Sequence, residues 1–395
     1  MNTKYGQLTY CSNIHPGEDW QDHFRELKNN IPAIKKDVSP NGPMGIGLRL
    51  ANEASKALCN DNQFYQLTNW LKDNDCFVFT MNGFPYGGFH NTRVKDQVHT
   101  PDWTTDDRFE YTKRLFSLLS NLLPGEIQSG GISTSPLSYR PWWSDTKQLD
   151  ATIHTATLNI LKTAEYLSRI YEESGQFLHL DIEPEPDGIL GNASDFFAWY
   201  LDILEPMARK YFGHPEKGSE IIRRHIQMCF DVCHFAVSYE NPEEIVHTLE
   251  KNEIRVGKIQ ISSALEIDLE KESEDKIQSL AQFDEPVYLH QVVAQLNRGG
   301  IESFRDLDSA LSGYTHGKYT SWRVHFHVPI FIEKFGLLQS TQKEIKDTLD
   351  LLKERKFTDH LEIETYTWGV LPKEMQVPTD KSIIREINWV KDYLH

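Results

Sequence analysis

The feature that most constrains the fold is a repeated alternation of short strand-like segments with longer amphipathic helices. Eight segments have the length and the alternating apolar pattern that are typical of strands. They are residues 8–13, 44–50, 76–82, 128–133, 177–183, 226–231, 256–262 and 361–366. Helical patterns lie between them, for example 107–123, 150–173 and 193–211. Strands that alternate with helices pair in parallel through right-handed crossovers, and eight such units close into a (β/α)₈ barrel.

The main alternative is an open, doubly wound α/β sheet, which typically has a glycine-rich dinucleotide fingerprint after an early strand. The sequence has no such fingerprint. We therefore predict an α/β fold in which residues 1–395 form a single TIM-barrel domain. Roughly a hundred residues separate the seventh and eighth strands, far more than one helix needs. We expect an insert at about 266–335, with strand-like stretches at 286–293 and 321–330, folded over the C-terminal mouth of the barrel.

Composition limits the kind of partner. The chain of 395 residues has a formal net charge of −17, which argues against nucleic acid or an anionic membrane as the main partner. No apolar stretch approaches a membrane span, and the polar start lacks the apolar segment of a signal peptide. The five cysteines show no paired framework. We expect a cytoplasmic protein that binds a small-molecule metabolite. The sequence does not decide whether the chain forms a homo-oligomer.

Acidic and amide side chains lie near the C-terminal ends of the last four predicted strands. They are Glu183, Asp231, Gln260 and Glu364, each on the face opposite the aliphatic residues of its strand. In a barrel that face points inward, and the C-terminal end is the catalytic one. Buried polar groups are costly unless they bind a ligand or one another, and three carboxylates with an amide oxygen suit Mg²⁺ or Mn²⁺. We predict a divalent-metal site there; the alternative is a buried hydrogen-bonded network.

Histidines extend the candidate ligand set. His234 follows Asp231 by three residues, a spacing that a strand cannot hold on one face, so the chain must turn after Asp231. His325 and His327 lie on one face of a strand-like stretch in the insert. Imidazole ligands shift the preferred ion towards Mn²⁺, Co²⁺ or Zn²⁺. The sequence does not decide between these ions and Mg²⁺.

The loops after the early strands predict a binding surface for a polyol or sugar-like ligand. They are rich in glycine and proline and carry amides, hydroxyls and aromatic rings, which stack on such ligands and hydrogen-bond to them. The candidate substrate-binding residues are His15, Arg49, Asn82, His90, Arg140, Trp142 and, on the seventh strand, Lys258. The alternative is that the glycines and prolines only shape tight turns, and that Trp142 packs between loops.

Three of these features together resemble the xylose isomerase-like superfamily of barrels. They are Glu183-Pro184 on the fifth strand, Asp231-x-x-His234 on the sixth and Glu364 on the eighth. The superfamily includes sugar and sugar-phosphate isomerases and epimerases, and endonuclease IV. For the sugar epimerases the resemblance implies a ligand set of Glu, Asp, His and Glu, which falls here on Glu183, Asp231, Gln260 and Glu364. Gln260 departs from the usual histidine of the seventh strand, and His325 or His327 can take its place.

A more specific resemblance is to the EboE family, described as metabolite traffic proteins of a bacterial gene cluster. It is carried by residues 8–18, 81–89, 131–139, 179–188 and 224–237, and it runs the length of the chain. The superfamily resemblance implies a metal-dependent isomerase or epimerase of a polyhydroxylated metabolite, with Glu183 and Glu364 exchanging a proton at carbon. The alternatives are metal-assisted hydrolysis of a small phosphoester and a non-catalytic carrier of the metabolite.

Overall fold

Nine strands form the main sheet, in the order β1-β2-β15-β8-β7-β6-β5-β4-β3. The computed structural model describes residues 1–89, 94–127, 129–369, 371, 373 and 376–395. Apart from the antiparallel β1 (Asn2–Thr3), neighbouring strands pair in parallel. The parallel strands are β2 (Gly6–Tyr10), β3 (Met44–Arg49), β4 (Cys76–Asn82), β5 (Ser129–Thr134), β6 (Phe177–Ile182), β7 (Ile226–Asp231), β8 (Val256–Ile261) and β15 (His360–Ile363).

The two edges of this sheet meet, which makes it a nearly closed barrel. Cys11, directly after β2, forms a parallel bridge with Gly47 of β3. The Thr9 hydroxyl donates to the carbonyl of Gly45, 2.8 Å away. The predicted barrel is therefore confirmed. Its strands begin and end within three residues of the predicted ranges, because apolar alternation defines the middle of a strand better than its ends.

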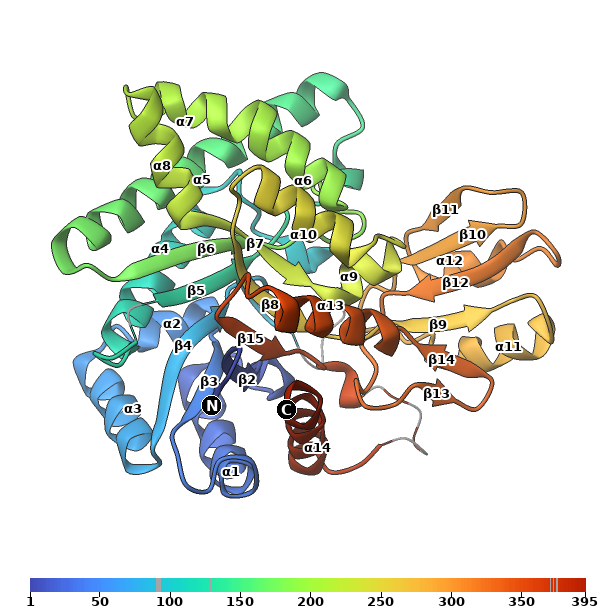
Figure 1. Ribbon diagram of the computed structural model, residues 1–395, viewed down its shortest axis with the longest axis horizontal. Coiled ribbons are helices and arrows are strands. Elements are labelled where there is room, and N and C mark those ends of the chain that lie inside the picture. Colours follow the sequence, from blue (N-terminus) through green and yellow to red (C-terminus); the bar gives the residue numbers. More distant parts are fainter. Residues whose placement is uncertain (90–93, 128, 370, 372, 374–375) are drawn as a thin grey trace.

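Helices cover the outside of the barrel (Figure 1). They are α1 (Trp20–Val38), α2 (Asn52–Ala57), α3 (Asp61–Asp73), α4 (Asp106–Leu122), α5 (Thr146–Ser174), α6 (Ala193–Trp199), α7 (Glu205–Tyr211), α8 (Pro215–His225), α9 (Val232–Val237), α10 (Pro242–Lys251), α13 (Gln342–Glu354) and α14 (Thr379–Leu394). Capping side chains start several of them, such as Asp145 for α5 and Asn241 for α10. The predicted helix at 193–211 is divided by a π-helical segment, Tyr200–Leu204, between α6 and α7.

The insert between β8 and β15 forms a second, antiparallel sheet in the order β11-β10-β12-β9-β14-β13. Its strands are β9 (Leu265–Asp268), β10 (Val292–Leu296), β11 (Ile301–Phe304), β12 (Tyr319–Val324), β13 (Lys334–Phe335) and β14 (Leu338–Ser340). The helices α11 (Ser273–Leu280) and α12 (Leu307–Ser312) supply Leu280 and Leu307 to an apolar cluster that also contains Trp322 of β12. Figure 1 shows this sheet beside the barrel, at the end to which the strand arrows point.

The strands predicted at 286–293 and 321–330 are shorter or displaced. Residues 284–291 and 325–330 are irregular segments, and the strands are β10 and β12 instead. These irregular segments cross the barrel mouth, and the backbone N–H of Val328 donates to the carbonyl of Ser263 at 2.9 Å. Apolar alternation alone could not separate a strand from an extended segment that packs on the barrel.

Charged side chains fill the middle of the barrel. Lys258 and Glu362 are fully buried and form an ion pair. Glycines on neighbouring strands make room for such groups. A Cβ atom at Gly257 would lie 1.8 Å from Asp181 Oδ1, and one at Gly47 would lie 1.9 Å from Glu362 Oε1. The interior is therefore polar below the strand ends, where many barrels have branched aliphatic residues.

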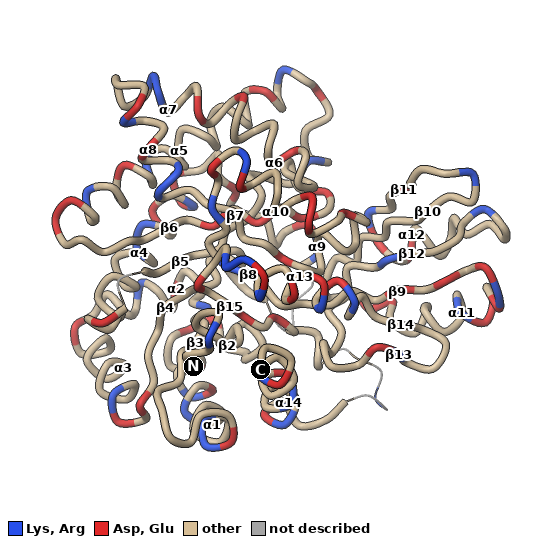
Figure 2. Tube along the Cα trace, in the orientation of Figure 1, with Lys and Arg blue, Asp and Glu red and all other residues tan. Residues whose placement is uncertain are grey.

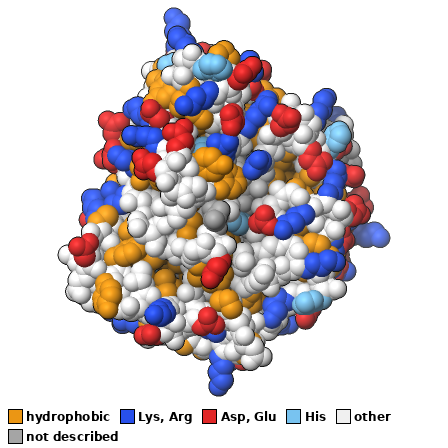
Figure 3. All heavy atoms as spheres, turned by 60° about the vertical axis from the view of Figure 1, so that its left-hand side comes forward, with side chains coloured by type: hydrophobic (Ala, Val, Ile, Leu, Met, Phe, Trp, Pro, Cys, Tyr) orange, Lys and Arg blue, Asp and Glu red, His pale blue; other side chains and the backbone are white. Residues whose placement is uncertain are grey.

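The outer surface carries charges of both signs. Figure 2 shows Lys and Arg interspersed with Asp and Glu along the outer helices, and neither sign forms a continuous surface on the face drawn in Figure 3. Among the described helices, none is both long enough and apolar enough to cross a membrane.

Candidate metal centre

Three buried carboxylates meet at the C-terminal end of the barrel. Glu183, Asp231 and Glu364 lie at the ends of β6, β7 and β15, and each is at most 4% exposed. One oxygen from each lies within 4.8 Å of the other two. Burial raises the pKa of Glu183 and of Glu364 well above the usual range, and the neighbouring carboxylates raise it further. A bound cation would remove this repulsion.

The amide of Gln260 lies among the three carboxylates. Its nitrogen donates to Asp231 Oδ2 at 3.2 Å, to Glu183 Oε1 at 3.4 Å and to Glu364 Oε2. Its oxygen accepts a hydrogen bond from the Cys229 thiol, 2.7 Å away. A half-turn of the terminal amide exchanges the two atoms, and it would then present an oxygen ligand to the same space. Gln260 thus fits either a hydrogen-bonded network or a metal site.

A helix cap explains the Asp231-x-x-His234 spacing. β7 ends at Asp231 and α9 begins at the next residue, so the chain turns where the spacing predicts. Asp231 Oδ1 accepts hydrogen bonds from the backbone N–H of His234 at 3.1 Å and from the Ser262 hydroxyl at 2.7 Å. These bonds direct Oδ2 towards the site, where it lies 3.9 Å from His234 Nε2.

Three histidine rings lie beside the carboxylates, and each is fixed through Nδ1. Nδ1 of His234 and of His327 lies within 2.9 Å of a backbone carbonyl, and His325 Nδ1 lies 2.7 Å from Gln291 Oε1. Because these partners are acceptors, each Nδ1 carries the donated proton and each Nε2 is directed into the site. This is the orientation that metal-ligating imidazoles adopt.

The Nε2 atoms of these rings are turned towards the site and towards one another. The Nε2 atoms of His234 and His325 are 3.2 Å apart, and Nε2 of His327 has no hydrogen-bond partner among the described residues. Burial lowers the pKa of His327 to about 4 and that of His325 well below its usual range. Either a proton on one ring or a metal cation between the rings can hold two Nε2 atoms in this facing arrangement.

Asp231 belongs to both sets of donors. Besides the carboxylate group, its oxygen lies within 4.8 Å of ligand atoms of His234 and His327. Glu185 forms a similar group with His234 and His325, and burial raises its pKa to about 8. The residues present therefore fit a divalent ion, with an oxygen-rich side and an imidazole-rich side that share Asp231.

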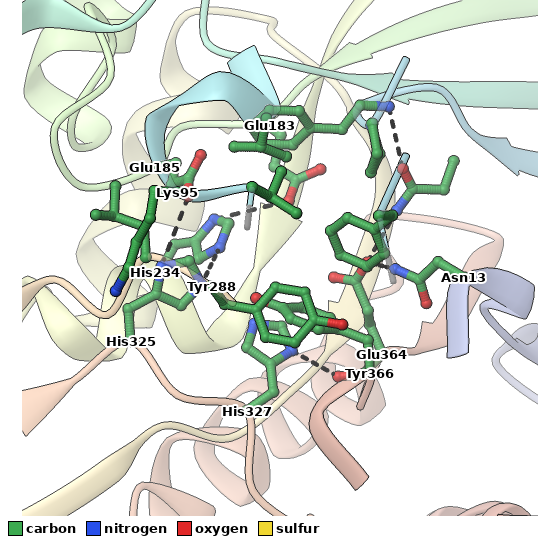
Figure 4. A pocket seen from close by; sticks show the side chains of 17 residues that line it. Asn13, Lys95, Glu183, Glu185, His234, Tyr288, His325, His327, Glu364 and Tyr366 are labelled. Carbon is green, nitrogen blue, oxygen red and sulfur yellow. Dashed lines mark hydrogen bonds and ion pairs between the residues drawn. The ribbon is translucent and has the colours of Figure 1, made fainter. Parts of the chain in front are cut away.

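Six of these donors line one pocket at the barrel mouth (Figure 4): Glu183, Glu185, His234, His325, His327 and Glu364. Asp231 and Gln260 lie behind them and are not part of its lining. The Nδ2 atoms of Asn13 and Asn82 donate to the same oxygen of Glu364, at 2.7 and 2.8 Å. Tyr288 and Tyr366 lie over the donors, and the void that remains is about 50 Å³. That volume accommodates an ion with a few water molecules.

Solved structures share this arrangement of strands and helices, although no protein-family model and no curated protein sequence matches the chain. One is a xylose isomerase-like TIM barrel protein from Mycobacterium smegmatis in complex with magnesium, with a TM-score of 0.52 and 10% identity, covering 100% of this chain and 98% of that chain. The fold is a xylose isomerase-like TIM barrel.

Two further structures are similar to the chain at lower scores. They are an IolI protein with a bound zinc atom and a D-tagatose 3-epimerase-like protein, each with a TM-score of 0.49 and 11% identity. The matches cover 98% of this chain in both cases, and 98% and 97% of the respective structures. Likeness at such identities establishes the fold alone, so the chemistry of the site rests on its geometry.

Within this xylose isomerase-like barrel, the predicted metal ligands come together, whereas most predicted substrate-binding residues do not. Among the described ones, Asn82 lines the pocket. His90 lies outside the described residues. The others have partners elsewhere: His15 at the Tyr10 hydroxyl, Arg49 at Glu18 and the Gly87 carbonyl, Arg140 at the Trp143 carbonyl, Trp142 at Asp96, and Lys258 at Glu362.

Several pocket residues were not predicted. Glu185 follows Glu183 by two residues, and the repeated Glu-Pro pattern was a signal that could have marked it. Asn13 stood in a glycine- and proline-rich loop without being singled out. Lys95 begins a short 3-10 helix, Lys95–His99, and Tyr288 lies in an irregular segment. Neither has a periodicity that indicates which side chain faces the site.

Lys258 supports the site from below, and its removal is expected to destabilise the fold. Its Nζ atom also lies 3.3 Å from Thr80 Oγ1 and from the Met81 carbonyl. Lys258→Met would leave Glu362 buried without its partner, which costs about 3–5 kcal/mol. Chemical denaturation measures the free energy of unfolding. The double variant Lys258→Met/Glu362→Gln should recover much of the stability that the single variant loses. A single variant as stable as the wild type would contradict the assigned pair.

Proposed function

We propose that the chain is a divalent-metal-dependent isomerase or epimerase of a small hydroxylated carbonyl compound. The observation that carries the proposal is the buried donor set at the barrel mouth, where Glu183, Asp231 and Glu364 adjoin three imidazoles. A divalent cation would offset the desolvation and mutual repulsion of these buried donors. The magnesium complex of the M. smegmatis barrel supports a divalent ion in this fold. We treat 1–395 as one domain, because barrel and insert both line the pocket.

We assign the donors to two ion positions that share Asp231. Glu183, Glu364 and the rotated amide of Gln260 complete an oxygen-rich position, which suits Mg²⁺ or Mn²⁺. The imidazole-rich position is formed by Asp231, His234 and His327, and His325 adjoins it through His234. That position suits Zn²⁺, Mn²⁺ or Co²⁺.

Glu183 is the better candidate for moving a proton. When bound, a divalent ion polarises a carbonyl and stabilises negative charge on its oxygen. Glu364 is held at one oxygen by two asparagine amides. In contrast, Glu183 Oε2 has no hydrogen-bond partner among the described residues. A carboxylate oxygen that is buried, unpaired and raised in pKa is suited to accept a proton from carbon. Glu364 then orients the ligand and supplies the second carboxylate.

A second candidate is a carrier that binds its metabolite without turnover. The amide nitrogen of Gln260 donates to all three carboxylates, which satisfies them in part without a cation. The resemblance to the EboE metabolite traffic family belongs to this proposal and agrees with either candidate. Metal content alone does not separate the two, because a carrier can also retain an ion. Turnover of a bound ligand does.

Deuterium incorporation separates the candidates. Protein stripped with a chelator and reloaded with Mn²⁺ is incubated with D-xylulose, D-fructose or dihydroxyacetone in deuterated water. We expect deuterium at the carbon next to the carbonyl in at least one compound, in the reloaded sample and not in the stripped one, read by NMR. A compound that binds the reloaded protein tightly but stays unlabelled after long incubation would favour the carrier instead.

A further inference from the structure

A second group of polar side chains lies at the N-terminal end of the barrel, away from the candidate metal centre and the second sheet (Figure 1). Ser129 begins β5, and His179 and Asp181 lie on the neighbouring strand β6. His179 Nδ1 is 2.6 Å from Asp181 Oδ1, and His179 Nε2 is 3.4 Å from Ser129 Oγ. A hydroxyl, an imidazole and a carboxylate therefore lie in the order that an activated serine requires.

Two glycines on the adjacent strands leave room for the histidine and the aspartate. A Cβ atom at Gly131 of β5, which pairs with His179, would lie 2.4 Å from His179 Cε1 and 2.5 Å from Asp181 Oδ2. One at Gly257 of β8 would lie 1.8 Å from Asp181 Oδ1. A side chain at either position would displace the imidazole or the carboxylate. The strands themselves therefore hold the two groups against each other.

The hydrogen bonds assign a role to each group. Asp181 is fully buried and His179 is 2% exposed. When the ionised carboxylate of Asp181 accepts from Nδ1, Nε2 of the neutral ring accepts from the Ser129 hydroxyl. A separation of 3.4 Å is long for a hydrogen bond, but bonds between a nucleophile and its base are often this loose before a substrate binds. His179 is thus placed to remove the proton from Ser129.

A cavity of about 270 Å³ gives access to this serine. Ser129, which is partly exposed, and His179 both line it. Arg255 and Lys356 line it as well, and the guanidinium carbon of Arg255 lies 5.4 Å from the ring centroid of Phe177. Cavities for drug-sized ligands are about 300–1,000 Å³, so this one suits a smaller molecule. Its cationic groups favour negative charge that develops on a carbonyl oxygen.

We propose that this end of the barrel is a second catalytic site, a serine-dependent hydrolase of short-chain carboxylic esters. Ser129 Oγ attacks the ester carbonyl carbon while its proton passes to His179 Nε2. The same proton then goes to the leaving alcohol oxygen as the ester C–O bond breaks. Water adds to the acyl carbon, gives one proton to His179 and releases the carboxylic acid, and that proton returns to Ser129. Asp181 is a positioning residue that keeps the ring in the reactive tautomer.

A fluorophosphonate, which forms a stable bond with activated serines, tests the nucleophile. The full chain is kept in EDTA, so that the result does not depend on the metal centre. We expect a single label by intact mass spectrometry, mapped to Ser129, and release of nitrophenolate from 4-nitrophenyl acetate. Ser129→Ala should lose both. A folded wild type that is unlabelled at Ser129, or ester cleavage that survives in Ser129→Ala, would overturn the proposal.

The matched control is Ser273→Ala, at a serine in the insert that also contacts a histidine. Ser273 Oγ lies 3.2 Å from His316 Nδ1, but Glu274 Oε1 lies 2.9 Å from the same nitrogen. The two contacts therefore share one ring nitrogen, and the carboxylate cannot hold the ring from its far side as Asp181 does. This variant should be labelled, and should cleave the ester, at the wild-type rate.

The Asp181→Asn variant separates positioning from a purely structural role. Asparagine keeps the size of the side chain but no longer favours the tautomer that accepts from Ser129. We expect labelling and kcat to fall at least about a hundredfold, while KM for 4-nitrophenyl acetate stays within about twofold. Circular dichroism during heating checks the fold. Labelling of the folded variant at the wild-type rate, or a rise in KM with kcat unchanged, would contradict the assigned role of Asp181 and the proposed site.

Discussion

The Asp231→Asn variant is expected to bind Mn²⁺ at least about a hundredfold more weakly than the wild type, because it loses an anionic ligand that both ion positions share. Its fold should survive. Asparagine caps helices as well as aspartate does, so the bond from the His234 backbone to Oδ1 can persist. Competition with a fluorescent chelator measures the affinity, and circular dichroism during heating checks the fold.

The matched control for this variant is Asp145→Asn. Asp145 caps α5 by accepting from the backbone N–H groups of Lys147 and Gln148, and it is exposed. The control therefore makes the same chemical change at a helix cap that takes no part in the site. It should keep the wild-type affinity. If Asp231→Asn also bound Mn²⁺ as tightly as the wild type, the shared position of Asp231 would be wrong.

Metal affinity should also rise with pH. Burial and the neighbouring carboxylates raise the pKa of Glu183 and of Glu364, so these groups hold protons in the metal-free protein at a pH where free glutamate is ionised. An ion that binds them displaces those protons, and higher pH removes this competition. The same competition experiment at pH 6 and pH 8 measures this effect, and Mn²⁺ should bind more tightly at pH 8.

The Glu183→Gln variant is expected to lose about 10²- to 10⁴-fold in deuterium exchange while it still binds its ligand, since general-base catalysis contributes about that much. The amide keeps one oxygen for the metal but cannot accept a proton. Exchange is followed by NMR, and ligand binding by calorimetry on the Mn²⁺-loaded protein. The exposed Glu172→Gln is the control and should behave as the wild type. If Glu183→Gln retained the metal and exchanged deuterium at the wild-type rate, Glu183 would not be the catalytic base.

The barrel and its strand-end carboxylates could be predicted because both depend on local patterns. Alternation defines β6, β7 and β8, and the same alternation fixes which face Glu183, Asp231 and Gln260 occupy. The turn after Asp231 also followed from spacing alone, and a side-chain cap produces it. These features need no knowledge of contacts between distant segments.

The rest of the site depends on such contacts. Lys258 was placed on the inner face correctly, yet its partner Glu362 is 104 residues away, so the sequence could not show that an ion pair occupies it. Segments 284–291 and 325–330 resemble strands in composition, but they pack across the mouth and carry Tyr288 and His325 to the pocket. Among the described residues predicted to bind substrate, Asn82 is the one that lines this pocket.

The central claim is that this barrel mouth holds divalent metal, and anomalous diffraction from crystals of the Mn²⁺-loaded protein tests it most directly. The account predicts an anomalous peak bounded by Glu183, Asp231 and Glu364, with the Gln260 amide turned to offer its oxygen. A second peak is expected beside Asp231, His234 and His327. Fully loaded crystals without a peak at the barrel mouth, and with the Gln260 nitrogen still bonded to the three carboxylates, would contradict the account.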